Sequence, residues 1–173
     1  TWGNAPGFAF SPDSKELCFI SNHTDHPEAN TNADLFVVPV TGGEAKCITA
    51  DNKAWDGTPK YSPDGRYIAY RFQVVPGHES DRFRLALYDR ATGEKRVLTE
   101  DIDNWVNDDY LWTPDSKSIY FGVQELGAVH IYKVDVKSGK HAKVLPDRAV
   151  GTFCLGNDGY LYYTYSTTGK PSA

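Results

Sequence analysis

A short turn sequence returns along the chain at a near-constant interval and constrains the fold more than any other feature. Residues 62–65 read Ser-Pro-Asp-Gly, in which Pro presets φ at the second place and Gly accepts a positive φ at the fourth. Related turns follow Phe10 and Trp112, and a degenerate copy follows Leu155. Phe10 lies 51 residues before Tyr61, and Tyr61 lies 51 residues before Trp112. Leu155 lies 43 residues beyond Trp112. A stretch with high β propensity follows each turn, at 17–20, 67–70, 119–123 and 160–165.

A second repeat keeps the same interval and consists of two apolar stretches around a glycine turn. Its turns contain Gly42, Gly93 and Gly139, spaced by 51 and 46 residues. Two hairpins per period make four short antiparallel strands, and a 40–50-residue period of such strands is typical of propeller blades. We therefore predict an all-β fold, a partial β-propeller of four-stranded antiparallel blades. In two turns Ser14 and Ser116 replace glycine, where a positive φ costs slightly more.

The predicted blades occupy residues 8–49, 58–99 and 109–145, and part of a fourth lies at 150–173. Three and a half blades leave two sheet faces uncovered, and a monomer seldom exposes large apolar faces. We therefore expect the chain to be a propeller fragment of a longer protein. We also expect this fragment to associate with itself in solution.

The composition excludes several classes of protein. The 173 residues, 40% of them hydrophobic, allow one domain with an apolar core. The net charge of −5 argues against a nucleic-acid partner, which needs a basic face. No apolar run is long enough to span a membrane. The first residues show no signal-peptide pattern, and periplasmic, secreted and cytoplasmic settings are all compatible with the sequence.

No cofactor or metal is expected. Cys18, Cys47 and Cys154 stand far apart among β-forming residues, so we expect small buried side chains and not a zinc site. A disulfide between two of them stays open. His23 and His26 lie in a polar loop without a fixed third ligand, and we expect surface histidines. The acidic stretch 100–109 departs from a calcium loop, because a tryptophan takes the third ligand place.

The alternation of strand direction sorts the connections onto two rims. Both kinds of tight turn share one rim, whereas the longer loops at 23–32, 73–82 and 124–128 share the other with the interblade links at 50–57 and 100–108. Long polar loops often carry function, so we expect binding on the second rim. Trp55 and Trp105 occupy equivalent places in the two links, which favours a packing role.

Residues 34–43, 56–65 and 77–85 together resemble the β-propeller of prolyl-oligopeptidase-family serine peptidases, in the dipeptidyl-peptidase and acylaminoacyl-peptidase-like branch. The Ser-Pro-Asp-Gly repeat alone is shared with TolB-like propellers of other function. The resemblance covers the whole chain and is strongest at 34–99. It implies that the propeller restricts access to short peptides and helps to bind the substrate's end. The partners it implies are a peptide substrate and a C-terminal α/β-hydrolase domain.

The chain itself carries no catalytic residue that we can identify. A nucleophile elbow needs Gly-x-Ser-x-Gly, and no serine here has glycine two places before it. The hydrolase domain is thus absent from this sequence, and we expect peptidase activity only in the parent protein. The paired glutamates that bind the substrate amine in some dipeptidyl peptidases are not recognisable either. The alternative is a TolB-like propeller that serves as a non-enzymatic protein-interaction scaffold. A sugar-handling propeller enzyme fits less well, because the acidic residues cluster in loops.

The candidate binding residues lie where the 73–82 loop meets the next strand, namely Glu79, Asp81, Arg82 and Arg84. They predict capture of a peptide terminus or docking against the hydrolase domain, since arginine pairs carboxylates in a bidentate manner. The structural alternative is an Asp–Arg pair that holds the loop within the domain. We favour that alternative, because such ion pairs are common.

Overall fold

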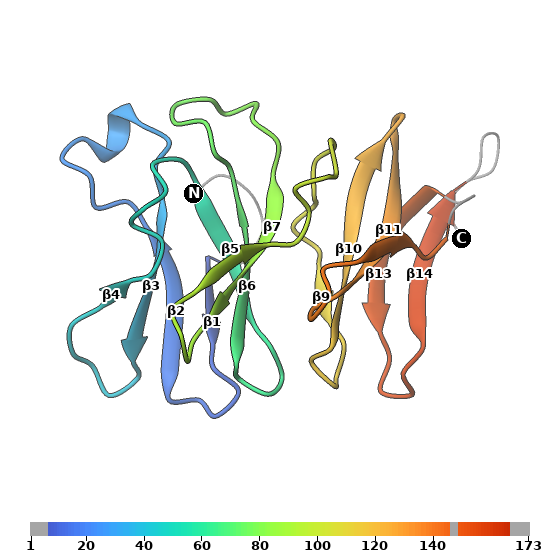
Figure 1. Ribbon diagram of the computed structural model, residues 1–173, viewed down its shortest axis with the longest axis horizontal. Coiled ribbons are helices and arrows are strands. Elements are labelled where there is room, and N and C mark those ends of the chain that lie inside the picture. The colour runs from blue at the N-terminus through green and yellow to red at the C-terminus, as the bar shows by residue number, and fades with distance from the viewer. Residues whose placement is uncertain (1–6, 146–148, 167–173) are drawn as a thin grey trace. The chain divides into compact units, whose positions relative to one another are not determined.

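The computed structural model describes residues 7–145 and 149–166, and in these ranges the chain forms β-strands and no α-helix (Figure 1). The predicted all-β class is therefore confirmed. The chain divides into two compact units, Thr1–Asp101 and Ile102–Ala173.

The first unit contains two four-stranded antiparallel sheets whose strands follow each other in chain order. One sheet consists of β1 (Phe8–Phe10), β2 (Glu16–Ser21), β3 (Asp34–Pro39) and β4 (Lys46–Cys47). The other consists of β5 (Asp56–Tyr61), β6 (Tyr67–Phe72), β7 (Arg84–Asp89) and β8 (Lys95–Val97). This simple meander is the order of a propeller blade, so the predicted four-stranded blades are confirmed.

The repeated turns have the conformation that their residues favour. In the second sheet the Ser62 hydroxyl donates to the Asp64 carboxylate at 2.6 Å, and Gly65 adopts φ 72°. In the first sheet the Ser11 hydroxyl donates to Asp13 at 2.7 Å, and Ser14 adopts φ 57°. The same serine–aspartate bond thus fixes both turns, and Ser14 takes the positive φ that glycine takes in the second copy.

The core of the first unit lies between its two sheets. Tyr70 and Ala86 of the second sheet pack there with Cys18 and Leu35 of the first, all buried. On the tight-turn rim, the Tyr61 hydroxyl donates to Glu16 Oε1 at 2.6 Å and so connects the two sheets. Burial of apolar surface contributes about 25 cal/mol per Å², so this shared core is what holds the two sheets together.

The second unit contains one four-stranded sheet and one hairpin. The sheet orders β12 (His141–Lys143), β11 (Ala128–Asp135), β10 (Ser118–Glu125) and β9 (Leu111–Trp112), and the hairpin pairs β13 (Ala149–Leu155) with β14 (Leu161–Ser166). Their core is formed by side chains that alternate inward along β10 and β11, such as Ile119, Phe121 and Ile131. The hairpin occupies the place of the predicted fourth blade, of which residues 167–173 lie outside the described ranges.

Two expectations need correction, and one open question is answered. The interblade link was predicted to reach residue 57, but Asp56 and Gly57 already belong to β5. Cys154 was expected to be buried, but it is exposed, because β13 and β14 present one face to solvent and residue 154 alternates onto it. All three cysteines are free, which answers the open question of a disulfide.

Candidate functional site

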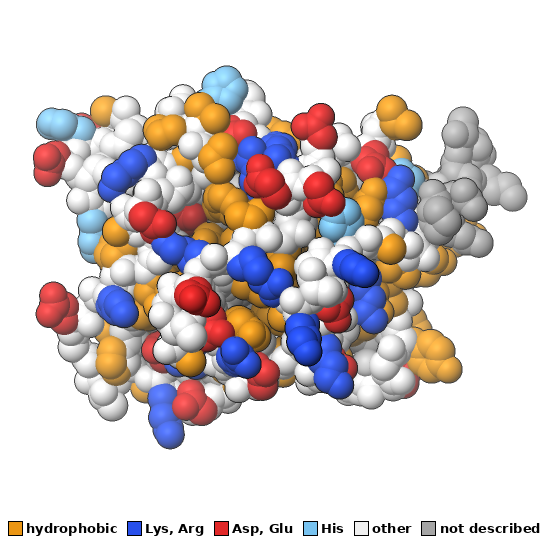
Figure 2. Space-filling model, in the orientation of Figure 1, with side chains coloured by type: hydrophobic (Ala, Val, Ile, Leu, Met, Phe, Trp, Pro, Cys, Tyr) orange, Lys and Arg blue, Asp and Glu red, His pale blue; other side chains and the backbone are white. Residues whose placement is uncertain are grey.

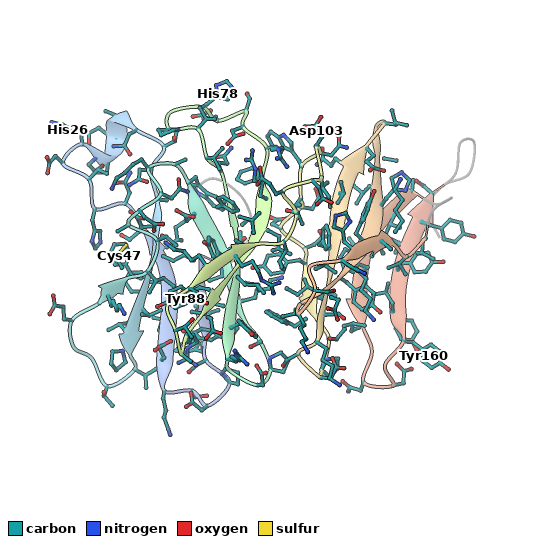
Figure 3. All side chains as sticks on the ribbon, viewed as in Figure 1. His26, Cys47, His78, Tyr88, Asp103 and Tyr160 are labelled. Atoms are coloured by element: carbon teal, nitrogen blue, oxygen red, sulfur yellow. The ribbon has the colours of Figure 1, made fainter. Side chains whose placement is uncertain are left out.

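The long connections of the first unit lie on one rim, opposite its tight turns (Figure 1). Between β2 and β3 the chain forms the 3-10 turn η1 (Pro27–Ala29). Between β6 and β7 it forms the loop 73–83. The loop tips carry His26 and His78, which project from this rim (Figure 3). The predicted division into a rim of tight turns and a rim of longer loops therefore describes this unit.

Asp81 closes the loop 73–83 onto its own start. Its carboxylate accepts hydrogen bonds from the backbone amides of Val74 at 2.7 Å and Val75 at 3.1 Å. Arg84 Nη1 lies 3.4 Å from the same carboxylate. Burial tends to raise the pKa of Asp81, but the two amides and the arginine charge outweigh it and hold that pKa below its usual value.

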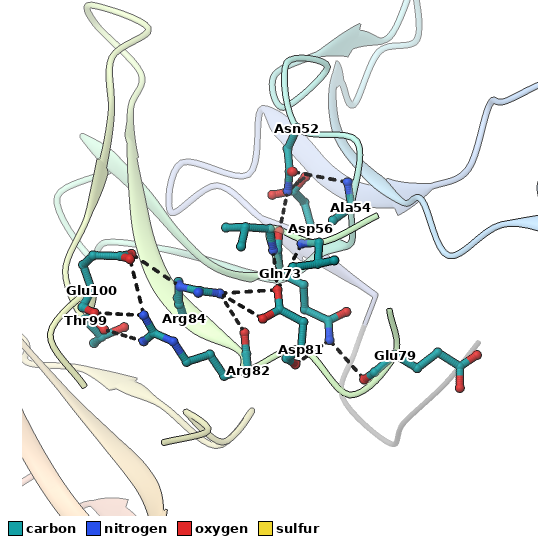
Figure 4. A network of polar contacts seen from close by, with 12 residues as sticks. Asn52, Ala54, Asp56, Gln73, Glu79, Asp81, Arg82, Arg84, Thr99 and Glu100 are labelled. Carbon is teal, nitrogen blue, oxygen red and sulfur yellow. Dashed lines mark hydrogen bonds and ion pairs between the residues drawn. The ribbon is translucent and has the colours of Figure 1, made fainter. Parts of the chain in front are cut away.

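Two arginines continue the network toward the end of the unit (Figure 4). Arg84 Nε lies 3.4 Å from Glu100 Oε2, and Arg84 Nη1 donates to the Arg82 carbonyl at 3.1 Å. Arg82 Nη2 donates to the Glu100 carbonyl at 2.9 Å and lies 3.3 Å from its carboxylate. The Arg84 side chain is 9% exposed and that of Glu100 is 67% exposed. The exposed Glu100 carboxylate therefore pairs with both guanidinium groups, of which that of Arg84 is buried and that of Arg82 is partly exposed.

Two amide side chains tie the loop to the link that precedes β5. Gln73 Nε2 donates to the carbonyls of Glu79 at 3.1 Å and Asp81 at 2.7 Å. Asn52 Nδ2 donates to the Gln73 carbonyl at 2.8 Å and to Asp56 Oδ2 at 3.0 Å. Sequence reasoning missed Asn52 and Gln73, because they bond to backbone carbonyls whose positions depend on the folded loop. It missed Asp56, because only the packing of the sheet buries this carboxyl group.

Asp56 is a buried carboxyl group at the start of β5, 1% exposed. Burial raises its pKa to about 8, and the nearby carboxylates of Asp34 and Asp51 act in the same direction. The hydrogen bond from Asn52 and the charge of Lys95 oppose this shift. Asp56 also borders a cavity of about 280 Å³. The group is therefore mostly protonated at neutral pH.

The structure brings together three of the four predicted site residues. Asp81, Arg82 and Arg84 share one network, whereas the Glu79 side chain is exposed and points away from it, with only its carbonyl engaged (Figure 4). The Asp81–Arg84 ion pair is the contact that the structural alternative requires. A carboxylate ligand at Arg82 would have to compete with Glu100. The binding role of these residues stays a prediction.

The other singled-out residues have structural neighbours. His23 packs on the Phe36 ring with centroids 4.3 Å apart, and His26 Nδ1 lies 3.5 Å from Glu28. Trp55 packs edge-on against Phe83 at 5.1 Å. Over the face visible in Figure 2, acidic and basic side chains are interspersed.

Two further features are absent from residues 7–145 and 149–166, a metal-binding cluster and a membrane-spanning helix. These residues contain no group of three or more histidine, cysteine or acidic side chains arranged to hold a metal. No helix in these ranges is long and apolar enough to cross a membrane.

Curated relatives of the chain are dipeptidyl peptidases. It is 32% identical over 168 residues to dipeptidyl-peptidase 5 of Porphyromonas gingivalis, covering 95% of this chain and 24% of that protein. It is 28% identical over 174 residues to dipeptidyl-peptidase 5 of Aspergillus fumigatus, covering 94% of this chain and 23% of that protein. The chain thus spans about a quarter of the length of these relatives. No family model matches the chain.

Solved structures with the same fold include propellers of different functions. A TolB protein of Agrobacterium tumefaciens superposes with a TM-score of 0.69 at 18% identity, covering 95% of this chain and 55% of that one. A prolyl endopeptidase superposes with a TM-score of 0.61 at 19% identity, covering 91% and 25%. At this identity the likeness shows the fold alone. Together with the relatives, it confirms the predicted resemblance to the propeller of prolyl-oligopeptidase-family peptidases.

Proposed function

We propose that this chain is the substrate-gating and substrate-binding propeller portion of a serine peptidase that resembles dipeptidyl-peptidase 5. The observation that carries the proposal is the 32% identity to the Porphyromonas protein across 95% of the chain. In this proposal the chain is not catalytic by itself. Bond cleavage belongs to a C-terminal α/β-hydrolase domain in the parent protein.

The rim of longer loops in the first unit supports the binding part of the proposal. The loop 73–83 is exposed at its tip, yet both of its ends are fixed by Asp81 and Gln73. A fixed base with an exposed tip suits a loop that contacts substrate or a neighbouring domain, because less conformational entropy is lost on binding. Arg82 and Arg84 supply positive charge beside this loop, and Glu79 supplies an exposed negative charge.

The experiment is an activity assay on the intact parent protein and on this chain alone. A reporter amide of an unblocked dipeptide is the substrate, and the same reporter with an acetylated amine is the control. We expect the intact protein to hydrolyse the unblocked reporter, and a serine-directed inhibitor to abolish that activity. We expect no hydrolysis by the isolated chain.

Two results would contradict the proposal. Hydrolysis by the isolated chain would place catalysis in residues that lack a nucleophile elbow. An intact protein with no peptidase activity toward either reporter would instead favour the non-enzymatic interaction scaffold. Preference for the acetylated reporter would keep the peptidase and change its class to an acylaminoacyl peptidase.

A further inference from the structure

We propose that a cavity on the tight-turn rim of the first unit is a second peptide site, which binds the C-terminal carboxylate of a short peptide with an apolar last residue. The cavity measures about 450 Å³ and is lined by residues of both sheets of this unit. The choice of a peptide as the ligand rests on the proposed function. The recognition of a carboxylate beside an apolar group rests only on the side chains of the cavity.

The charged side chains that line this cavity are mainly cations. They are Lys46 of β4, Arg66 and Arg90 beside two of the tight turns, and one carboxylate, Glu16 of β2. Their sum stays positive when Asp89, the partner of Arg66, is counted with them. The whole chain carries a net charge of −5, so this cavity is a local positive region on an acidic protein. Such a region attracts anions.

The two arginines are held in place and still have donors to offer. Arg66 Nε and Nη2 donate to Asp89 Oδ2 at 3.2 and 3.0 Å. Arg90 Nη2 lies 3.1 Å from Glu16 Oε1, and its Nη1 donates to the Gly65 carbonyl at 2.5 Å. A guanidinium group carries five N–H donors, so each arginine keeps N–H groups for a ligand. Because both side chains are already oriented, less conformational entropy is lost when a carboxylate binds.

Lys46 is the cation that an incoming carboxylate meets without competition. Its side chain is exposed, and its ammonium group makes no hydrogen bond or ion pair with residues 7–145 or 149–166. A ligand carboxylate therefore pairs with Lys46 without displacing an acidic side chain of the protein. Arg82 on the other rim differs in this respect, because Glu100 already pairs with it.

The apolar part of the cavity lies beside these cations. It consists of Val37, Ile68 and Tyr88, of which Tyr88 is marked in Figure 3. Ile68 is fully buried, Tyr88 is 8% exposed and Val37 is half-buried. A ligand that joins a carboxylate to an apolar side chain uses both parts, as a C-terminal leucine does, whereas inorganic phosphate uses the charges alone. The volume falls within the range of about 300–1,000 Å³ that is usual for small-molecule sites.

The test is equilibrium dialysis of labelled acetyl-Ala-Leu against the intact parent protein, after treatment with a covalent serine-directed inhibitor. The inhibitor keeps the peptide whole and blocks the catalytic site, so the binding that remains belongs to other sites. We expect saturable binding with a Kd on the order of 1 mM, because exposed ion pairs are individually weak. Unlabelled peptides and inorganic phosphate are then compared as competitors.

The competitors separate the charge from the apolar group. The C-terminal amide of acetyl-Ala-Leu should bind at least about tenfold more weakly, because it lacks the charge that the cations attract. Acetyl-Ala-Gly should bind about tenfold more weakly, because it buries no apolar side chain. Inorganic phosphate should compete only at concentrations at least about tenfold higher than acetyl-Ala-Leu, for the same reason.

Two lysine variants locate the binding. Lys46→Gln removes the charge of an exposed side chain and should weaken the binding of acetyl-Ala-Leu about fivefold. Lys15→Gln is the matched control, because Lys15 precedes Glu16 on the same rim but does not line the cavity, and its ammonium group lies 3.9 Å from Asp13. It removes the same charge and should leave the affinity within about twofold, as expected for a screened, more distant charge.

Three results overturn the inference. They are an equal affinity for the acid and the amide, an unchanged affinity in Lys46→Gln, and equal losses in Lys46→Gln and Lys15→Gln. Phosphate that competes as well as acetyl-Ala-Leu overturns the assignment to peptides and leaves a general anion site. Because binding is measured on an inhibited protein, an inactive parent would refute the proposed function without altering this result. Absence of binding at the cavity would likewise leave a measured peptidase activity untouched.

Discussion

Replacing Asp56 with asparagine changes the global stability of the protein in a way that depends on pH. Asparagine keeps the shape of the side chain and an oxygen that can accept the bond from Asn52, but it removes the ionisable group. In the unfolded chain Asp56 ionises near pH 4. In the folded chain its pKa is raised to about 8. Folding therefore requires proton uptake between these values, and the free energy of unfolding of the wild type falls as pH rises.

The magnitude follows from the width of this window. Each pH unit within it costs about 1.4 kcal/mol. From pH 5 to pH 8 the wild type should thus lose roughly 4 kcal/mol relative to Asp56→Asn, which is a large share of a typical stability of about 5–15 kcal/mol. Above pH 8 the difference should level off, because the folded state then also loses the proton.

Urea unfolding of both proteins at pH 5, 6.5, 8 and 9 measures this difference. Other titrating groups are common to both proteins and cancel. A difference that does not change between pH 5 and pH 8 would mean that Asp56 ionises in the folded state as easily as in the unfolded one, and that its pKa is not raised.

Two other substitutions in the first unit give defined outcomes. Arg84→Met keeps the buried apolar stem but removes the charge facing Asp81. It should cost about 2 kcal/mol in urea unfolding, less than the 3–5 kcal/mol of a fully orphaned buried charge, because two backbone amides still bond the carboxylate. Tyr61→Phe removes the hydroxyl that donates to Glu16, and it should cost about 1–2 kcal/mol by the same assay. A Glu16→Gln background should shrink that second effect, and an undiminished effect would show that the hydroxyl acts elsewhere.

The fold followed from the sequence because its signals are local and repeated. The Ser-Pro-Asp turns fix their own geometry through a serine–aspartate bond within the turn, so the same residues give the same turn wherever they occur. The end of the second repeat, residues 47–49 and 97–99, likewise makes the same contact in both blades. The Thr49 hydroxyl accepts from the Leu35 amide at 2.9 Å, and Thr99 makes the same bond to Leu85 one period later.

The candidate site followed only in part. The charged residues Asp81 and Arg84 stand close in sequence, and their ion pair could be anticipated from that spacing. Asn52 and Gln73 could not be found in this way, because their main partners are backbone carbonyls of a folded loop. Asp56 resembles a polar link residue in the sequence, and only the sheet packing buries it.

If this propeller restricts a peptidase to short substrates, as proposed above, hydrolysis by the intact protein must depend on substrate length. One N-terminal dipeptide sequence is presented as a reporter amide, in peptides of increasing length and at the end of a folded protein, and kcat/KM is measured for each. We expect efficient cleavage of the short substrates and a steep fall of kcat/KM with length, down to no cleavage of the folded protein. An equal kcat/KM for short peptides and for the folded protein would contradict it.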